Sequence, residues 1–339
     1  MLKRLFPLDF SETRSIYLGG GTPSRLSPET LSQLVQWLKA NIVSTRPIQW
    51  SIELNPEDVT RVYVKTIREL GFSRVSLGVQ SFVGRHLKIL GRNHSPLDSK
   101  NAITHLQNSG IEDINLDFLF GYPEQNKKTL IEDLREFLSY HPTHLSIYCL
   151  NIERKTALFR KKEWKSWQQR NENLIVELYE TAVDWVETNG ILQYEISNFS
   201  TPGYQSLQNL CYWNGSDYLG LGMGAHSFLF PFRWGNWKRW IDYRNALQNT
   251  AQPIEFIENL NKEQRRDEEL MIGLRLSEGL NLTHFLNKYN LAVSKNWSDK
   301  ISALRSEKLA VLENNHFKLT SRGMLIADEI AVSLSASIA

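Results

Sequence analysis

The stretch Ser15-Ile-Tyr-Leu-Gly-Gly-Gly-Thr-Pro-Ser24 decides the fold. A run of apolar and β-branched residues ends at Leu18, three glycines follow, and a helical pattern starts near Pro28. Glycine allows positive φ and leaves no Cβ in the way of a ligand, and amides near a helix start can bind an anionic group. The stretch predicts a buried strand, a glycine loop and a helix, serving either as a ligand loop or only as a tight turn. It contains neither GxGxxG nor GxxxxGK[ST], the standard nucleotide-binding patterns.

Strand and helix patterns alternate from the glycine loop to Phe199. Because every connection is long enough for a crossover, the alternation predicts a parallel α/β sheet, open or barrel-like, within a first domain of residues 1–232. The expected strands are residues 15–18, 49–54, 74–80, 113–120, 143–150 and 194–199. The expected helices, in which apolar residues recur at helical spacing, are residues 28–42, 59–70, 97–109, 128–139 and 174–188.

Polar residues gather where these strands end. Ligands of parallel α/β folds bind at the carboxyl ends of the strands. Glu53 and Asp117 each end a buried strand, where a carboxylate without a partner is costly. Either alone could be a structural capping group, but two on one rim predict a site for a cationic or multi-hydroxyl ligand. The other polar or glycine positions on this rim are residues 19–22, Asn55, Gln80, Ser81, Tyr148 and Asn151.

The chain changes character after Phe199. Residues 214–224 read as a glycine-rich loop, and helical patterns return later, followed by a hairpin over residues 310–320. This order predicts a small winged-helix-like α+β domain over residues 233–339. Because no expected helix is strongly basic, we interpret it as a packing or docking domain and not as a DNA reader.

Composition excludes several classes of protein. Lys and Arg total 39 against 37 for Asp and Glu, a net charge of +2, so we expect no nucleic-acid partner. Cys149 and Cys211 are far apart, which indicates neither a disulfide framework nor a local metal motif. No stretch approaches the roughly 18 apolar residues of a membrane span. Pro7 and Asp9 interrupt any apolar run in Met1–Phe10, so we expect no signal peptide and a cytoplasmic protein.

The motifs, taken together and in order, resemble a known family. They are similar to those of the oxygen-independent coproporphyrinogen III oxidase family of radical S-adenosylmethionine (SAM) proteins, which implies a partial (β/α)6 barrel. Two later stretches, Tyr194–Phe199 and Gly220–Ser227, look like the heme-chaperone branch of that family. The earlier motifs are Gly19-Gly-Gly-Thr-Pro23, Glu53-Leu-Asn-Pro56, Gly78-Val-Gln-Ser-Phe82, Leu90-Gly-Arg-Asn-His94, Asn115-Leu-Asp117 and Gly121-Tyr-Pro123.

The resemblance implies a SAM site on the rim of the barrel. By position in the motifs, Gly20, Gly21 and Thr22 would hold the amino-acid end of SAM, and Glu53 its ribose side. Arg92 suits the SAM carboxylate as a bidentate donor. The remaining residues that the motifs place around SAM are Gln80, Asp117 and, through its backbone near the adenine, Asn151.

One departure from the family pattern concerns iron and sulfur. The family places a CxxxCxxC loop, whose three thiolates bind a 4Fe-4S cluster, ahead of the GGGTP segment, and this chain has no cysteine there. Cys149 and Cys211 cannot replace a compact three-cysteine loop, because such clusters need thiolate ligands. We therefore expect no cluster ligands in this chain. The family's first strand is also missing, which predicts an open edge at the barrel seam.

A second departure concerns heme. The chaperone pattern has His-Asn before Tyr-Trp, where this chain has Gln208-Asn209 before Tyr212-Trp213. If that histidine ligates heme iron, Gln208 is a poorer ligand, and His226 or Cys211 are the local alternatives. Residues 194–240 are also dense in aromatic rings, which either form a core or offer a porphyrin a stacking surface.

These implications leave three interpretations open. The first is a heme chaperone that passes heme to an acceptor protein the sequence does not identify, with a homodimer as one possible assembly. The second is an oxidase acting on coproporphyrinogen III in porphyrin biosynthesis, disfavoured because the longer N-terminal region of that enzyme has no counterpart here. The third is an inactive or mis-started product, because a start codon chosen downstream would remove the first strand and the cysteine loop.

Overall fold

The computed structural model describes residues 9–152, 162–249 and 252–338. The chain forms two compact units, Phe10–Leu207 and a C-terminal unit that starts at Gln208. The predicted domain boundary after residue 232 stays a prediction, although residues 208–232 belong to the C-terminal unit here. Residues 1–8, where the predicted first domain starts, lie outside the described part.

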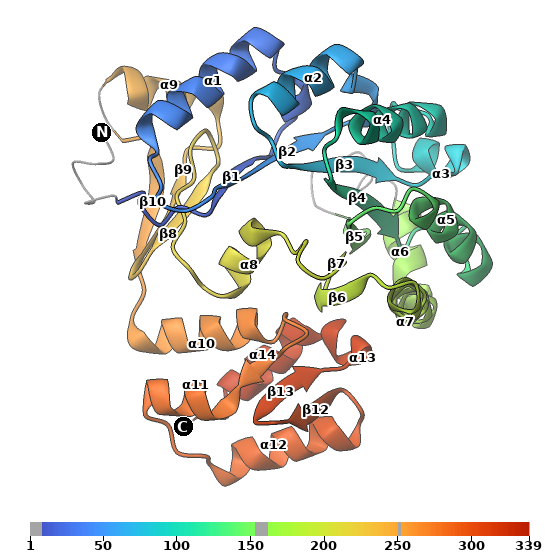
Figure 1. Ribbon diagram of the computed structural model, residues 1–339. Coiled ribbons are helices and arrows are strands. Elements are labelled where there is room, and N and C mark those ends of the chain that lie inside the picture. Colours follow the sequence, from blue (N-terminus) through green and yellow to red (C-terminus); the bar gives the residue numbers. More distant parts are fainter. Residues whose placement is uncertain (1–8, 153–161, 250–251, 339) are drawn as a thin grey trace. The chain divides into compact units, whose positions relative to one another are not determined.

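The first unit is built on a curved seven-stranded sheet with the order β1-β2-β3-β4-β5-β7-β6 (Figure 1). Its first five strands are parallel to one another. They are β1 (Ser15–Leu18), β2 (Gln49–Leu54), β3 (Arg74–Gln80), β4 (Asp113–Phe120) and β5 (His144–Cys149). The predicted partial barrel of the radical-SAM type is confirmed, and β1 is an edge strand of the described sheet.

The end of the sheet corrects one prediction. Residues 194–199 were expected to form a single strand, but the chain forms a hairpin of β6 (Leu192–Glu195) and β7 (Asn198–Ser200). Strand β7 pairs antiparallel with both β5 and β6. The Glu195 carboxylate accepts a hydrogen bond from the Ser197 amide at 3.2 Å, and such local bonds stabilise a turn in place of a continuous strand.

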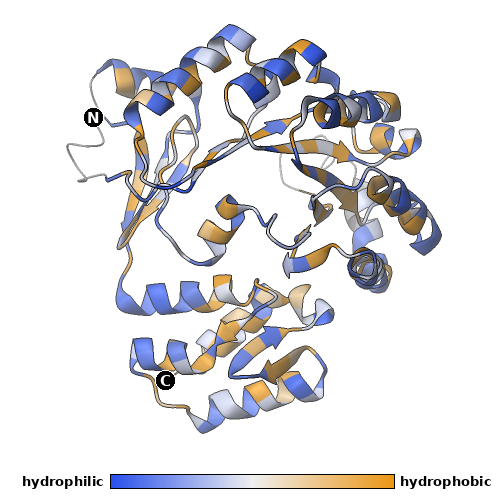
Figure 2. Ribbon diagram, in the orientation of Figure 1, coloured by the Kyte–Doolittle hydropathy of each residue, from blue (hydrophilic) through white to orange (hydrophobic). Residues whose placement is uncertain are grey.

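Amphipathic helices cover the convex face of this sheet (Figure 1). Their ribbons alternate between hydrophilic and hydrophobic colour in Figure 2, as expected for helices with one buried face. Side chains of Ser27, Thr60, Ser95 and Asn126 cap four of them. The helices are α1 (Pro28–Asn41), α2 (Arg61–Glu69), α3 (Gly84–Ile89), α4 (Pro96–Ser109), α5 (Lys127–Ser139), α6 (Lys162–Arg170) and α7 (Glu172–Thr188).

The two faces of the sheet differ sharply in chemistry. Successive side chains of a strand point to opposite faces. One alternating set is apolar and buried, and it supplies the core with residues such as Ile52, Leu54, Val75, Leu77, Leu116 and Phe118. The other set is polar and includes Glu53, Ser76, Asn115, Asp117, His144 and Ser146. The apolar set packs against the helices, and the polar set, of which Asn115, His144 and Ser146 are buried, is available to position a site.

The second unit starts with α8 (Leu207–Trp213), followed by the glycine-rich loop that the sequence predicted. A three-stranded antiparallel sheet follows, with the order β10-β9-β8. Its strands are β8 (His226–Leu229), β9 (Phe232–Asn236) and β10 (Ile254–Asn259), and α9 (Trp240–Gln248) lies between the last two in the chain. The sequence patterns did not reveal this sheet.

The C-terminal segment has the winged-helix order that the sequence predicted. Phe285 and Phe317 are fully buried in it, and the Thr320 hydroxyl caps the helix that follows the hairpin. Its elements are α10 (Lys262–Gly273), β11 (Leu280–Asn281), α11 (Leu282–Tyr289), α12 (Lys295–Ser306), β12 (Ala310–Glu313), β13 (His316–Leu319), α13 (Ser321–Met324) and α14 (Ala327–Ser335). Within the described ranges, no helix combines the length and apolar character needed to cross a membrane.

Candidate functional site

The three glycines after β1 have different roles. Gly19 leaves room for a neighbouring ring, because a Cβ at this position would lie 2.2 Å from Tyr17 Cε1. Gly20 and Gly21 have φ values of 70° and 45°, in the left-handed region that favours glycine. Residues 19–22 are exposed, so the loop presents its backbone to the surroundings.

Glu53, near the end of β2, is held on both carboxylate oxygens. The Tyr17 hydroxyl donates to Oε1, and the Gly20 amide donates to Oε2 at 3.1 Å. A carboxylate fixed by two donors keeps free acceptor positions, so Glu53 can still bind hydroxyl groups or a positive charge. Glu53 therefore connects the glycine loop to the polar face of the sheet.

Asp117 lies on β4 on the same face. Its Oδ1 accepts hydrogen bonds from Asn115 Nδ2 at 2.8 Å and from the Ser76 hydroxyl at 3.3 Å. Burial raises the pKa of the Asp117 carboxyl to about 6, and the nearby Glu53 carboxylate adds to the rise. The two predicted carboxylates are thus close enough to repel one another, which a cationic ligand would relieve.

Tyr17 and Tyr148 complete this group of side chains. They are 36% and 40% exposed, so their rings reach the open side of the sheet. Burial of the hydroxyl and the charges of Glu53 and Asp117 raise the pKa of Tyr17, with Tyr148 adding to the effect. Burial and Asp117 likewise raise the pKa of Tyr148. Both hydroxyls therefore stay protonated and act as donors at neutral pH.

A buried hydrogen-bond network continues across the polar face beyond Asp117. Asn115 Oδ1 accepts from the Ser146 hydroxyl at 3.1 Å and from His144 Nδ1 at 2.6 Å. On its other nitrogen, His144 Nε2 accepts from the Tyr194 hydroxyl at 2.8 Å. Burial, with the Arg74 charge adding, lowers the pKa of His144 well below its ordinary value. This network is uncharged, and through Asn115 it holds the Asp117 carboxylate in place.

Gln80 ends β3 with a φ of 68°, and its side chain is buried. Residues other than glycine are strained in this region, and such strain is typical of functional sites. The absent side chain of Gly78 makes room, because a Cβ there would lie 3.1 Å from Gln80 Nε2 and 3.8 Å from Asn55 Oδ1. Gln80 therefore lies beside Asn55, where β2 and β3 end.

Ser81 does not line the rim as the sequence suggested. It is fully buried, and its hydroxyl donates to Asp133 Oδ2 and lies 3.4 Å from His86 Nδ1. The other oxygen of Asp133 accepts the Phe82 amide at 2.8 Å. Burial raises the pKa of Asp133 to about 6. These contacts fix the turn that directly follows Gln80.

Arg92 and Asn151 take no part in the contacts described above. Arg92 follows α3, its amide donates to Leu87 O at 2.9 Å, and its side chain is exposed. Asn151 follows β5 and is also exposed. The structure therefore brings together Gly20, Glu53 and Asp117, and the assignment of Arg92 and Asn151 to a SAM site stays a prediction.

The heme candidates of the second unit divide into two groups. Gln208, Cys211 and Tyr212 have the i, i+3, i+4 spacing of one helix face on α8. Cys211 Sγ donates to Asp217 O at 3.5 Å, and burial raises the pKa of this thiol, with Asp217 adding. The thiolate that would bind iron is therefore disfavoured. Tyr212 is 39% exposed.

Trp213 and His226 differ in how they are covered. The guanidinium of Arg275 lies 4.6 Å from the ring centroid of Trp213, so this ring serves packing. His226 opens β8 and is exposed, and one edge of its imidazole packs against Phe256, with the ring centroids 5.6 Å apart. Of these two residues, His226 is the one that a ligand can reach directly.

An exposed apolar loop leads directly to His226. Leu221 and Met223 are 51% and 56% exposed, so the loop presents two large apolar side chains at the surface. The buried Asn236 fixes the loop, because its Nδ2 donates to Gly222 O at 2.8 Å. The sequence analysis noted the glycines of this loop but missed its apolar side chains.

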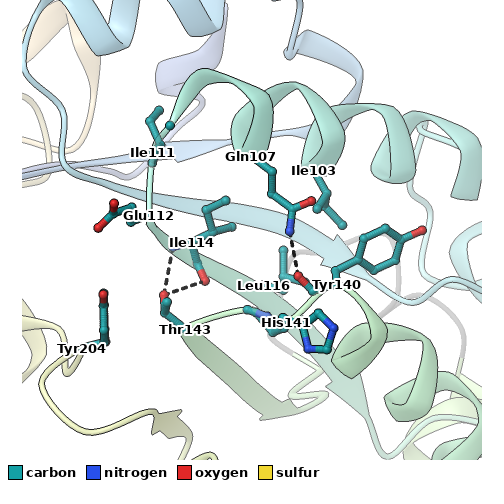
Figure 3. Close-up of a pocket in the computed structure, with 12 residues that line it drawn as sticks. Ile103, Gln107, Ile111, Glu112, Ile114, Leu116, Tyr140, His141, Thr143 and Tyr204 are labelled. Carbon is teal, nitrogen blue, oxygen red and sulfur yellow. Dashed lines mark hydrogen bonds between the residues drawn. The ribbon is translucent and has the colours of Figure 1, made fainter.

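The described part of the first unit also contains a pocket of about 370 Å³ at the opposite end of the strands (Figure 3). It lies near the amino-terminal ends of β4 and β5, between α4 and α5. Thr143 Oγ1 accepts from the Ile114 amide at 3.0 Å, and Gln107 Nε2 donates to Tyr140 O at 2.7 Å. Its polar side chains thus tie the loops together, and none of the predicted site residues lines it.

The barrel-like sheet, the glycine loop and the rim carboxylates are those of a radical SAM protein, and the comparisons with known proteins agree. The sequence profile of the Radical SAM superfamily matches residues 2–137, and that of the HemN C-terminal domain matches residues 260–326. Among solved structures, coproporphyrinogen III oxidase (HemN) from Escherichia coli, described as a radical SAM enzyme, aligns with a TM-score of 0.80. It is 18% identical, and the alignment covers 96% of this chain and 78% of the other, a likeness of fold alone.

Two curated relatives narrow the family. The heme chaperone HemW of Bacillus subtilis is 30% identical over 94% of this chain and 84% of its own length. The heme chaperone HemW of Mycobacterium tuberculosis (strain H37Rv) is 31% identical over 96% of this chain and 82% of its own length. The chain therefore belongs to the HemW family of radical SAM proteins.

The residues present fit SAM but do not fit a 4Fe-4S cluster. The bare glycine loop, Glu53 and Asp117 offer amide donors and carboxylate acceptors that suit SAM. A 4Fe-4S cluster needs several thiolates, and the sequence has two cysteines, one in each unit. Cys149 ends β5 and is exposed. The two cysteines therefore do not fit the family's cluster.

Sequence reasoning missed Tyr17. Its hydrogen bond to Glu53 joins residues 36 positions apart. The strand alternation in Ser15–Leu18 contained the signal, because it places Tyr17 opposite the buried Ile16 and on the face of the carboxylates.

Proposed function

We propose that this protein is a heme chaperone that binds heme through its second unit and passes it to an acceptor protein, while its first unit binds SAM. The names of the relatives support the first part. The observation that carries the proposal is the exposed His226 imidazole, three residues after the exposed Met223 and five after the exposed Leu221. A heme needs apolar contact for its ring and a nitrogen or sulfur ligand for its iron.

The SAM site of the proposal uses groups already described. Glu53 and Asp117 would bind the ribose hydroxyls and positive charge of SAM, and the amides of the glycine loop would bind its carboxylate. When bound, SAM would supply an adenosyl group joined to a sulfonium. The two cysteines give no basis for a step through a 4Fe-4S cluster. We further propose a cytoplasmic location, and the homodimer stays a prediction that light scattering can measure.

A heme titration tests the chaperone proposal. We expect the optical Soret band to shift and to saturate near one heme per chain. His226→Ala should weaken binding by about tenfold or more, because the iron loses its ligand, whereas Cys211→Ala should have little effect because its thiol is disfavoured as thiolate. Gln208→His should strengthen binding if α8 faces the iron, since it restores the histidine of the family pattern.

The control variant is His284→Ala. This histidine lies on α11, is exposed, and belongs to the same unit, so the variant removes a similar side chain far along the chain from the candidate surface. Equal weakening by His284→Ala and His226→Ala would indicate nonspecific heme adsorption. A wild-type chain without any saturable Soret shift would refute heme binding.

A further inference from the structure

We propose that Tyr17 is a positioning residue of the SAM site, one that fixes the ribose-binding carboxylate Glu53 and thereby sets the preference for a ligand with free ribose hydroxyls. This inference rests on the proposed SAM site. It concerns a residue that the family motifs do not single out, and it follows from contacts on the polar face of the sheet.

The backbone is built around the ring of Tyr17. The position of a Cβ on residue 19 would be 2.2 Å from Tyr17 Cε1 and 2.9 Å from Glu53 Oε1. Gly19 has no positive φ, so close approach and not backbone conformation requires glycine there. The missing side chain of Gly19 therefore leaves the space in which the Tyr17 ring and the Glu53 carboxylate contact each other.

The hydroxyl of Tyr17, and not its ring alone, serves this contact. A phenylalanine would fill the same space on the strand, but only tyrosine can donate to Glu53 Oε1. The Gly20 amide holds Oε2 at the same time. Two donors, a side-chain hydroxyl on β1 and a backbone amide of the glycine loop, fix the rotation of the carboxylate, so its remaining lone pairs keep one direction.

This arrangement restricts the class of ligand. The Glu53 carboxylate is near enough to Asp117 to raise its pKa, and the proton of the Tyr17 hydroxyl is used by Glu53. The site therefore offers a ligand negatively charged hydrogen-bond acceptors. A ligand must donate to it, as the vicinal hydroxyls of a ribose do. A ribose phosphate would place negative charge next to two carboxylates and would be rejected. The site thus takes a nucleoside with an unmodified diol.

The test compares a diol with a deoxy ligand. Calorimetry with SAM gives the affinity of the purified chain, and competition with adenosine and 2′-deoxyadenosine gives the diol preference. We expect the wild type to prefer adenosine by roughly tenfold, about the value of one hydrogen bond to a charged group. Tyr17→Phe should bind SAM more weakly and reduce the preference to about threefold or less.

Two further variants separate the possible results. Glu53→Gln should weaken SAM binding and abolish the preference. Tyr63→Phe is the matched control, because it removes a tyrosine hydroxyl that donates to Pro23 O at 3.1 Å beside the glycine loop but from the helix side. It should keep the wild-type preference even if it lowers the melting temperature.

Each negative result refutes a different claim, either the role of Tyr17 or the SAM site itself. If Glu53→Gln weakens SAM binding while Tyr17→Phe keeps both the affinity and the preference of the wild type, the role of Tyr17 is overturned and the SAM site stands. If Glu53→Gln binds SAM as the wild type does, or the wild type shows no saturable SAM binding, the SAM site itself falls. The heme titration is unaffected by either result.

Discussion

Removing the carboxylate of Asp113 should strongly destabilise the first unit. Arg74 and Asp113 face each other at the start of β3 and β4, with Arg74 Nη1 2.6 Å from Asp113 Oδ1. Their side chains are only 4% and 11% exposed. Asp113→Ala would leave the guanidinium buried without its counter-charge, which typically costs 3–5 kcal/mol. Since Arg74 would keep its bond to Tyr204 O at 3.2 Å, we expect the lower value, about 3 kcal/mol.

Urea unfolding followed by circular dichroism measures this loss. Because the chain has two compact units, the transition of the first unit must be fitted separately. The surface pair Lys128 and Glu132, 3.9 Å apart and largely exposed, provides the control. Glu132→Ala should cost at most about 0.5 kcal/mol, since solvent screens such pairs.

A double variant tests the cause of the loss. Arg74→Met combined with Asp113→Leu removes both buried charges and should recover most of the stability that Asp113→Ala loses. The reasoning is refuted if Asp113→Ala costs less than about 1 kcal/mol, because the pair would then be as weak as an exposed one.

Two more predictions follow from buried polar groups. Asp133 has a pKa of about 6 in the folded chain against 3.8 as its ordinary value, so the folded state binds more protons between these pH values. Asp133 should therefore contribute a fall in stability on the order of 2 kcal/mol as pH rises from about 4 to 6, and Asp117, whose pKa is also about 6, adds to this fall. Asp133→Asn should remove its own part of the slope in urea unfolding, and an unchanged slope would contradict the assignment. Asn236→Ala should cost about 1–3 kcal/mol and speed amide exchange in residues 220–224, because Gly222 O loses its buried donor. Mass spectrometry showing unchanged exchange there would mean that the loop is fixed by other contacts.

Periodicity predicted most of the first unit because its helices and parallel strands have long, regular patterns. Thus the strand over residues 49–54 and the strand over residues 113–120 match β2 and β4 as predicted. The rim carboxylates followed from the same reasoning, since a carboxylate at the end of an apolar strand is conspicuous. The hairpin of β6 and β7 was not predictable, because a local bond from the Ser197 amide to Glu195 decides it.

Contacts between distant segments limited the prediction of the site. The Tyr17 bond to Glu53 depends on the register between β1 and β2, and the positive φ of Gln80 depends on the packing of the next turn. Ser81 looked like a rim residue because a serine at a strand end is polar, but its partner Asp133 lies 52 residues away and holds it inside. Sequence patterns record which residues are polar and leave open which polar groups satisfy one another.

The division of the curved sheet into one apolar and one polar face has a consequence for evolution. Substitutions at the apolar positions of β2–β4 alter the folding free energy, because the helices pack there. Substitutions at the exposed positions of the other face, such as Tyr17 on β1 and Tyr148 on β5, change the chemistry offered to a ligand and disturb the core little. Descendants of this chain can therefore acquire new ligand preferences at positions such as Tyr17 and Tyr148 without first acquiring compensating stability, which makes this face a favourable starting point for directed evolution.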